Sequence, residues 1–192
     1  MEGFTEEGKA VGVLLDISLR HESTGARVLD LVKEQLVEVV KNHFDDGLDV
    51  LYLYHPDLVD PVNRHGEQTH HISNYDTDGW LFNMNFALKQ TLYALGMQEC
   101  DLRRYLVLIT DRMFDIRPLE LVIQLNDKDM LDAQLILVGI GDHYDQPAFA
   151  ALAKEGKAIH IHLNSASELI QQLCKEHYGP ENICCPTNER CQ

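Results

Sequence analysis

Short apolar runs alternate with stretches of helical periodicity along most of this chain, and this alternation constrains its fold more than any other feature. The runs at 11–15, 49–54, 105–109, 133–140 and 158–163 have the length of strands, and several are apolar throughout, as in strands buried on both faces. Apolar residues recur at helical spacing in 26–43, 81–96 and 147–155, and Pro118 can open a further helix. Strands joined by crossover helices run mainly parallel. With a short edge strand at 69–73, the sequence predicts a doubly wound α/β fold, a mainly parallel six-stranded sheet with helices on both faces.

One continuous domain is expected over residues 1–179, because no low-complexity linker or repeat interrupts the alternation. Residues 180–192 hold two prolines and three of the five cysteines, and we expect a flexible tail there. An odd number of cysteines crowded at one end does not resemble a secreted disulfide framework. The apolar runs are far shorter than the roughly 18–20 residues that cross a bilayer, and the N-terminus is acidic. These features predict a cytoplasmic protein without membrane insertion.

The formal net charge of −15 argues against nucleic acid and anionic lipid as partners. Residues 44–80 carry eight Asp and Glu side chains against Arg64 alone. If this acidic region adjoins the binding face, as we expect, the partner has a basic surface and binding weakens with salt.

Polar residues follow two of the predicted strands where each strand ends. Asp16-Ile-Ser18-Leu-Arg20 follows the first strand, and Thr110-Asp111-Arg112 ends the run that begins at 105. In a parallel α/β sheet, functional loops lie at the carboxyl ends of the strands. The functional residues of this chain are therefore expected at that edge.

These two motifs, in this order, resemble those of von Willebrand factor A (vWA) domains, and the resemblance extends over roughly residues 8–178. In that family the first strand ends in Asp-x-Ser-x-Ser and the fourth in an aliphatic-Thr-Asp-Gly motif. The resemblance implies a Rossmann-like fold and a metal-ion-dependent adhesion site (MIDAS), which usually holds magnesium and presents it to a partner's carboxylate. It makes Asp16, Ser18 and Asp111 the candidate magnesium ligands. Thr77 is the candidate for the family's separate threonine, although counting back from the next helix places Phe82 there.

Two arginines depart from the family pattern. Arg20 stands where the family has a second serine, and Arg112 stands where it has glycine. A guanidinium does not lose its charge at any physiological pH, so it competes with a divalent cation. Our hypothesis is that Arg20 sits against Asp16 or Asp111 and leaves a degenerate site with weak or vestigial magnesium binding. The alternative is that Arg20 points into solvent and the site binds metal weakly; no cofactor is firmly implied.

The function that follows is a non-catalytic protein–protein interaction module or adaptor that binds another protein through the loops at this edge. The expected partner-binding residues are Asp16, Ser18, Arg20, Thr77, Asp78, Asp111 and Arg112. One alternative is a magnesium-dependent phosphatase of haloacid-dehalogenase type with Asp16 as nucleophile, but Ser18 stands where that chemistry needs a general acid. Asp142 and Asp145, which would serve the metal, also fit a turn and a helix N-cap. The other alternative is a self-associating scaffold domain.

Two sets of side chains outside these motifs, a pair of histidines and three aromatic residues, can have a structural or a functional role. His160 and His162 share one face of an extended segment, and we expect them to be satisfied structural histidines, not metal ligands. Phe86 is expected to pack against the protein, whereas Trp80 and Phe82 could pack or form part of a partner surface.

Overall fold

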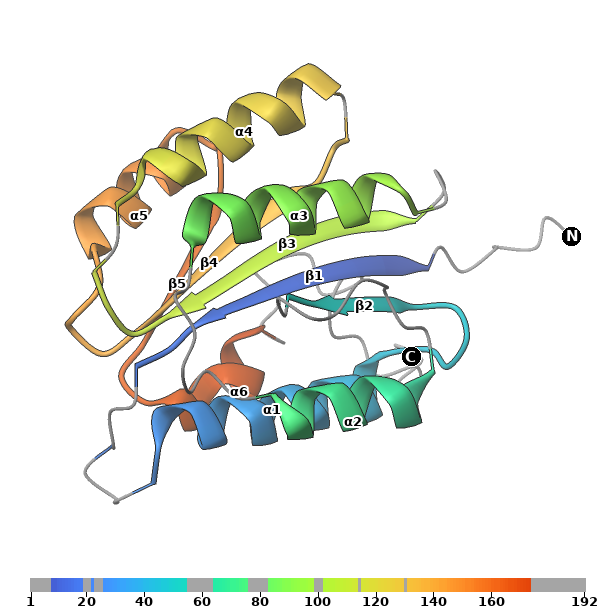
Figure 1. The fold of residues 1–192 in the computed structure, drawn as a ribbon. Coiled ribbons are helices and arrows are strands. Elements are labelled where there is room, and N and C mark those ends of the chain that lie inside the picture. The colour runs from blue at the N-terminus through green and yellow to red at the C-terminus, as the bar shows by residue number, and fades with distance from the viewer. Residues whose placement is uncertain are drawn as a thin grey trace, which may run out of the picture.

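The computed structural model describes residues 8–18, 22, 26–54, 64–75, 83–98, 102–113, 115–129 and 131–173. Within them, five strands form one parallel sheet in the order β2-β1-β3-β4-β5 (Figure 1). The strands are β1 (Lys9–Asp16), β2 (Val50–Leu53), β3 (Arg103–Thr110), β4 (Gln134–Ile140) and β5 (Ile159–Leu163). The predicted α/β class and parallel sheet are confirmed.

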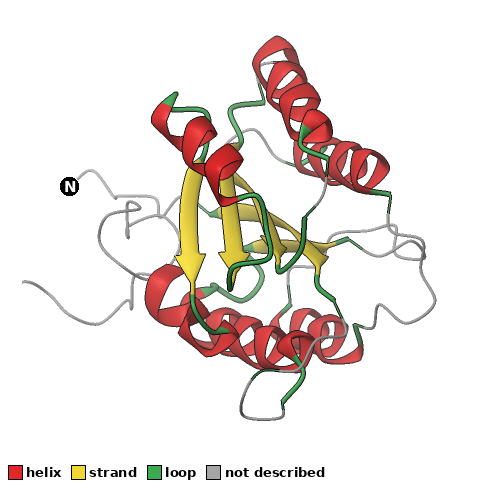
Figure 2. Ribbon diagram, turned by 90° about the vertical axis from the view of Figure 1, so that its left-hand side faces the viewer, coloured by secondary structure: helices red, strands yellow, loops and turns green. Residues whose placement is uncertain are grey.

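Helices cover both faces of the sheet, so that the strands lie between two helical layers (Figures 1 and 2). One layer contains α1 (Val28–His43), α2 (His65–Asn74) and α6 (Leu169–Leu173), which follows a short 3₁₀ turn, η1 (Ala166–Glu168). The other contains α3 (Met84–Gly96), α4 (Arg117–Asp129) and α5 (Gln146–Lys154). This is the doubly wound arrangement that crossover helices produce.

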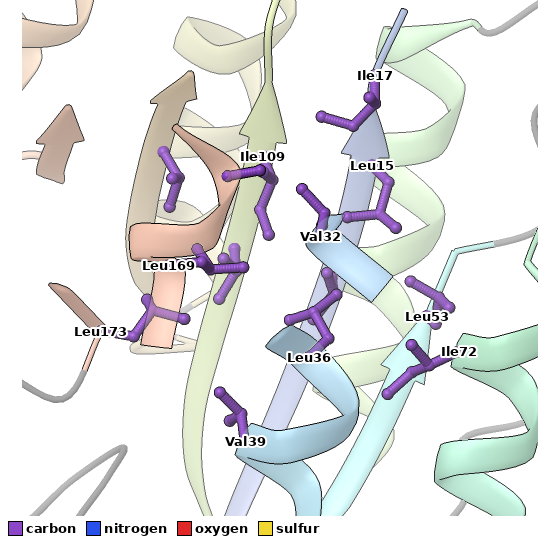
Figure 3. Close-up of a cluster of buried hydrophobic side chains, with 14 of the residues drawn as sticks. Leu15, Ile17, Val32, Leu36, Val39, Leu53, Ile72, Ile109, Leu169 and Leu173 are labelled. Carbon is purple, nitrogen blue, oxygen red and sulfur yellow. The ribbon is translucent and has the colours of Figure 1, made fainter. Parts of the chain in front are cut away.

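The core has one half on each face of the sheet, because alternate residues of each strand point to opposite sides. On the α1 side, Leu15 and Ile109 pack against Val32, Leu36 and Leu169 (Figure 3). The other half is built in the same way from the sheet residues Leu14, Leu106 and Leu108 with Leu88, Leu92 and Phe149 from the helices. Both halves fix the strands whose ends carry the candidate site.

The predicted edge strand at 69–73 is wrong, because this segment belongs to helix α2. Gln68 and Ile72 are one helical turn apart and both are buried. Ile72 joins the core beside α1, and the Gln68 amide donates to the carbonyl of Asp49 at 3.0 Å. These contacts with distant segments, not any strong local pattern, select the helix, and they leave five strands among the described residues.

Several other expectations concern the ends and the surface of the chain. Phe86 is 52 % exposed, so the expectation that it packs against the protein is wrong. Trp80, Phe82, residues 174–179 and the tail at 180–192 lie outside the described residues. No helix in the described ranges combines the length and apolarity that crossing a membrane requires.

Candidate functional site

Two buried carboxylates lie side by side at the carboxyl edge of the sheet. Asp16 is the last residue of β1 and pairs in register with Thr110, the last residue of β3, so Asp111 follows directly beside it. Asp16 and Asp111 are each only 2 % exposed, and Thr110 is fully buried. Buried carboxylates need hydrogen-bonding or charged partners. The partners of these two groups define the chemistry of the site.

Arg112 is the charged partner of Asp16. Its Nε donates to Asp16 Oδ1 at 2.6 Å, and its Nη2 also donates to this oxygen. The Thr110 hydroxyl lies 3.3 Å from Asp16 Oδ2 and 3.1 Å from the carbonyl oxygen of Arg112, and with one proton it donates to one of them at a time. The backbone N–H of Arg112 donates back to the Thr110 hydroxyl at 3.3 Å. Thr110 therefore holds the turn that brings Arg112 onto Asp16.

Ser18 is the partner of Asp111. Its backbone N–H donates to Asp111 Oδ1 at 2.7 Å, and its hydroxyl donates to Asp111 Oδ2 at 2.6 Å. Hydrogen bonds to an ionised acceptor are stronger than neutral ones. This pair of bonds ties the loop after β1 to the loop after β3, so the two motifs of the sequence form one site.

Tyr75 lies beneath this site, and sequence reasoning did not identify it. Its side chain is buried, and its hydroxyl donates to the carbonyl of Leu15 at 3.3 Å, one residue before Asp16. Burial, and then the negative charge of Asp16, raise the pKa of Tyr75 well above its usual value. The phenol therefore stays neutral and supports the end of β1. No pattern near Tyr75 indicates this role, because it depends on how α2 docks.

The structure brings together four of the seven predicted site residues: Asp16, Ser18, Asp111 and Arg112. Arg20, Thr77 and Asp78 lie outside the described residues, so the proposed role of Arg20 stays a prediction. The guanidinium found on Asp16 belongs to Arg112. Its position directly after Asp111, in place of the family's glycine, was the signal that could have identified it.

The acidic region is not placed as a whole beside this site. Asp45, Asp46 and Asp49 precede β2, at the amino edge of the sheet and thus opposite Asp16. Asp49 is buried there, where it accepts from Lys9 N at 2.9 Å and pairs with Lys9 Nζ at 2.8 Å. The expectation that the acidic region adjoins the binding face is therefore wrong for these three residues. Asp49 lies beside the first residue of β1, whereas Asp16 is its last residue.

The oxygen atoms of the four site residues already have partners within the site. Asp16 Oδ1 faces the guanidinium, both Asp111 oxygens accept hydrogen bonds from Ser18, and the Ser18 hydroxyl is directed at Asp111. A magnesium ion needs about six oxygen ligands in a near-octahedral shell, so it would have to compete with these contacts. The described part of the chain contains no group of three or more His, Cys, Asp or Glu side chains that could hold a metal ion.

The acidic residues of the phosphatase alternative lie in a turn and at a helix cap. Asp145 is the N-cap of α5, and its carboxylate accepts from the backbone N–H of Ala148 at 3.0 Å, as the N-cap interpretation predicts. Asp142 lies in the turn after β4.

Comparison with known proteins identifies the fold. No family model and no curated protein matches this sequence. Among solved structures, an aerotolerance-related membrane protein from Bacteroides fragilis is 14 % identical, with a TM-score of 0.63 over 85 % of this chain and 95 % of that one. A von Willebrand factor type A protein from Catenulispora acidiphila is 13 % identical, with a TM-score of 0.63 over 85 % of this chain and 41 % of that one. Proximal thread matrix protein 1 from the mussel byssus, solved with a zinc-occupied MIDAS motif, is 11 % identical, with a TM-score of 0.60 over 86 % of this chain and 44 % of that one.

The chain therefore has the vWA fold, as the motifs predicted. Identities this low establish a common fold and carry no residue roles across. The metal in the mussel protein is a property of that protein.

Proposed function

We propose that this chain is a protein-interaction domain that binds its partner at the carboxyl edge of the sheet, through the loops after β1 and β3. The fold likeness to vWA proteins supports an interaction module, and the ion pair between the buried Asp16 and the part-exposed Arg112 carries the proposal at this site. The loops are held in place by that pair and by the bonds between Ser18 and Asp111. A binding surface that is already ordered loses less entropy on association.

Arg112 is the side chain that offers the partner a charged contact. It is 45 % exposed although it pairs with Asp16, and Met113 beside it is exposed as well. A guanidinium has five N–H donors, of which Nε and Nη2 serve Asp16, so it can bond a second carboxylate at the same time. The proposed contact is a carboxylate of the partner, met by Arg112 without a metal ion between them.

A catalytic role has less support. A nucleophilic carboxylate must reach its substrate, whereas Asp16 is 2 % exposed and already bonded to Arg112. The cytoplasm stays the expected location on the basis of the cysteine pattern alone.

The test compares binding by the wild-type chain and by Arg112→Gln. A protein captured by the wild-type chain is purified, and its Kd is measured for both chains with magnesium and with a chelator. We expect Arg112→Gln to weaken binding about tenfold or more and the chelator to change nothing. Lys157→Gln is the matched control, because it removes one positive charge before β5, at the opposite edge of the sheet. An unchanged Kd for a folded Arg112→Gln chain contradicts the proposal.

A further inference from the structure

The outer face of α3 carries large apolar side chains in place of charged ones. Phe86 is 52 % exposed, Tyr93 66 % and Met97, which follows the helix directly, 68 %. These residues are seven and four positions apart, so they form one stripe along the helix. The opposite side of α3 enters the core through Met84, Leu88, Leu92 and Leu95. An apolar stripe therefore also runs along the exposed side of this helix.

The other long helix follows the usual pattern. The exposed positions of α1 include Glu34, Glu38 and Lys41, which keep its outer face polar. Along α3 the exposed positions are Asn85, Phe86, Lys89, Gln90 and Tyr93, followed by Met97. Figure 1 shows α3 lying over the sheet with α4 to one side of it. Exposed apolar groups that line up along one helix are typical of an interaction surface.

The charge on this stripe restricts the partner. The chain has a net charge of −15, so two copies repel each other across most of their surfaces. The exposed face of α3 carries no carboxylate and only one charged group, Lys89. Two copies can therefore approach each other here without bringing acidic groups together. The same face has nothing to attract a strongly basic partner.

We propose that a second copy of this chain binds on this stripe, with the two α3 helices packed antiparallel about a two-fold axis. A two-fold interface uses the same surface on both copies. In this arrangement Phe86 lies opposite Met97 of the second copy and Tyr93 lies opposite Gln90. Lys89 then lies opposite Ala94, whereas a parallel pair would place Lys89 against its own equivalent. The antiparallel pair also sets opposite ends of the helix dipoles side by side.

The apolar area of the stripe limits the affinity of the dimer. A fully buried aromatic side chain contributes roughly 150–250 Å², so three partly exposed side chains provide a few hundred square ångströms. Stable interfaces bury about 800 Å² on each partner. We therefore expect a weak, reversible dimer with a Kd of about 10–100 µM, stabilised by burial of Phe86, Tyr93 and Met97.

Sedimentation of the full chain tests this dimer, with a reducing agent present because the chain has five cysteines. Over about 5–500 µM protein we expect a monomer–dimer equilibrium in this Kd range. Added salt should strengthen it, because salt screens the repulsion between two acidic copies. Tyr93→Glu should raise the Kd about tenfold or more. Ala150→Glu is the control, since it adds the same charge at an exposed position of α5, and it should leave the Kd unchanged.

Cross-linking through lysine locates the interface. A link between Lys89 and Lys89 can form only between two copies, and the proposed packing brings both side chains within reach of a short amine-reactive cross-linker. A chain that stays monomeric at the highest concentration overturns the proposal. So does a dimer that Tyr93→Glu does not weaken, or one that gives no such cross-link. None of these results depends on partner binding at Arg112, so the two proposals can fail separately.

Discussion

Asp16 and Arg112 form an ion pair between groups 96 positions apart in the chain, with Arg112 Nε 2.6 Å from Asp16 Oδ1. The carboxylate is 2 % exposed and the guanidinium 45 % exposed, so the pair bridges the interior and the surface. Removing the cation would leave a buried carboxylate without its charged partner, which is costly. Arg112 thus acts as a built-in counter-ion for Asp16.

Arg112→Gly should therefore create magnesium affinity. The change removes the fixed positive charge, restores the glycine of the vWA pattern and frees Asp16 Oδ1 for another cation. We expect calorimetry to show no magnesium binding by the wild-type chain at about 10 mM, and a Kd of roughly 1 mM for the variant. The added ion should also raise the melting temperature of the variant alone. The double variant Arg112→Gly with Asp16→Asn is the control and should bind none. Magnesium binding by the wild-type chain would show that Arg112 does not exclude the ion.

Tyr144 depends on the absence of a side chain at Gly139. A Cβ added to Gly139 would overlap atoms of the Tyr144 ring, well inside any real contact distance. Gly139→Ala should force the ring away and lower the free energy of unfolding by about 2–3 kcal/mol. Urea denaturation measures this loss. Gly66→Ala is the matched control: it lies in α2 with open space around the added Cβ, so its stability should stay the same or rise by up to ~1 kcal/mol. Equal effects of the two changes would contradict the packing argument.

The strands could be predicted because each one is an apolar run of consecutive residues. The side-chain pairs of the site, Asp16 with Arg112 and Ser18 with Asp111, could not be predicted from such local patterns. Five strands and the helices α1, α3, α4 and α5 lie where the sequence pattern placed them, within a few residues. Helix α2 was missed because only Gln68 and Ile72 are buried in it, and the histidines between them fit a helix or a strand equally well. The local sequence does not show that the guanidinium beside Asp16 belongs to Arg112. This contact depends on the register of β1 with β3, which pairs Asp16 with Thr110.

The free energy of unfolding should fall at acid pH, because the folded chain disfavours protonation in the cluster of Tyr144, His160 and His162. The Tyr144 hydroxyl lies 2.9 Å from His160 Nε2 and 2.9 Å from His162 Nδ1, and the ring of Phe149 packs edge-on against His160. With one proton, the hydroxyl donates to one imidazole and accepts from the other. Burial and then His162 lower the pKa of His160 below its usual 6.5, while burial and then Asp142 raise the pKa of Tyr144 to about 12.

The sign of this effect follows from linkage. The folded chain holds His160 neutral more strongly than the unfolded chain does, so the unfolded state binds more protons near pH 6.5. The contribution of His160 is fully present above pH 6.5 and is lost as the pH falls through its lowered pKa. His43, whose pKa is also lowered by burial, acts in the same direction. We expect the urea midpoint to fall between about pH 7.5 and 5.5, and His160→Gln to reduce that fall. His143→Gln, which changes an exposed histidine, should leave it as in the wild-type chain. The same fall in both variants would exclude this role for His160.

Glu22, between β1 and α1, is bonded to the start of the last helical segment. Removing its carboxylate should lower the stability of the chain and speed hydrogen exchange at this contact. Its carboxylate accepts from the Ser165 hydroxyl and from the backbone N–H of Ala166, each at 2.8 Å. Hydrogen bonds to a charged acceptor contribute more than neutral ones, so Glu22→Ala should lower the free energy of unfolding by about 1–2 kcal/mol. Hydrogen exchange should become faster at the Ala166 amide, which loses its acceptor. Glu38→Ala, on the exposed face of α1, is the control and should leave this amide unchanged. Because Glu22 lies only four residues after Ser18, faster exchange at Ser18 as well would indicate that this clamp also steadies the bonds from Ser18 to Asp111.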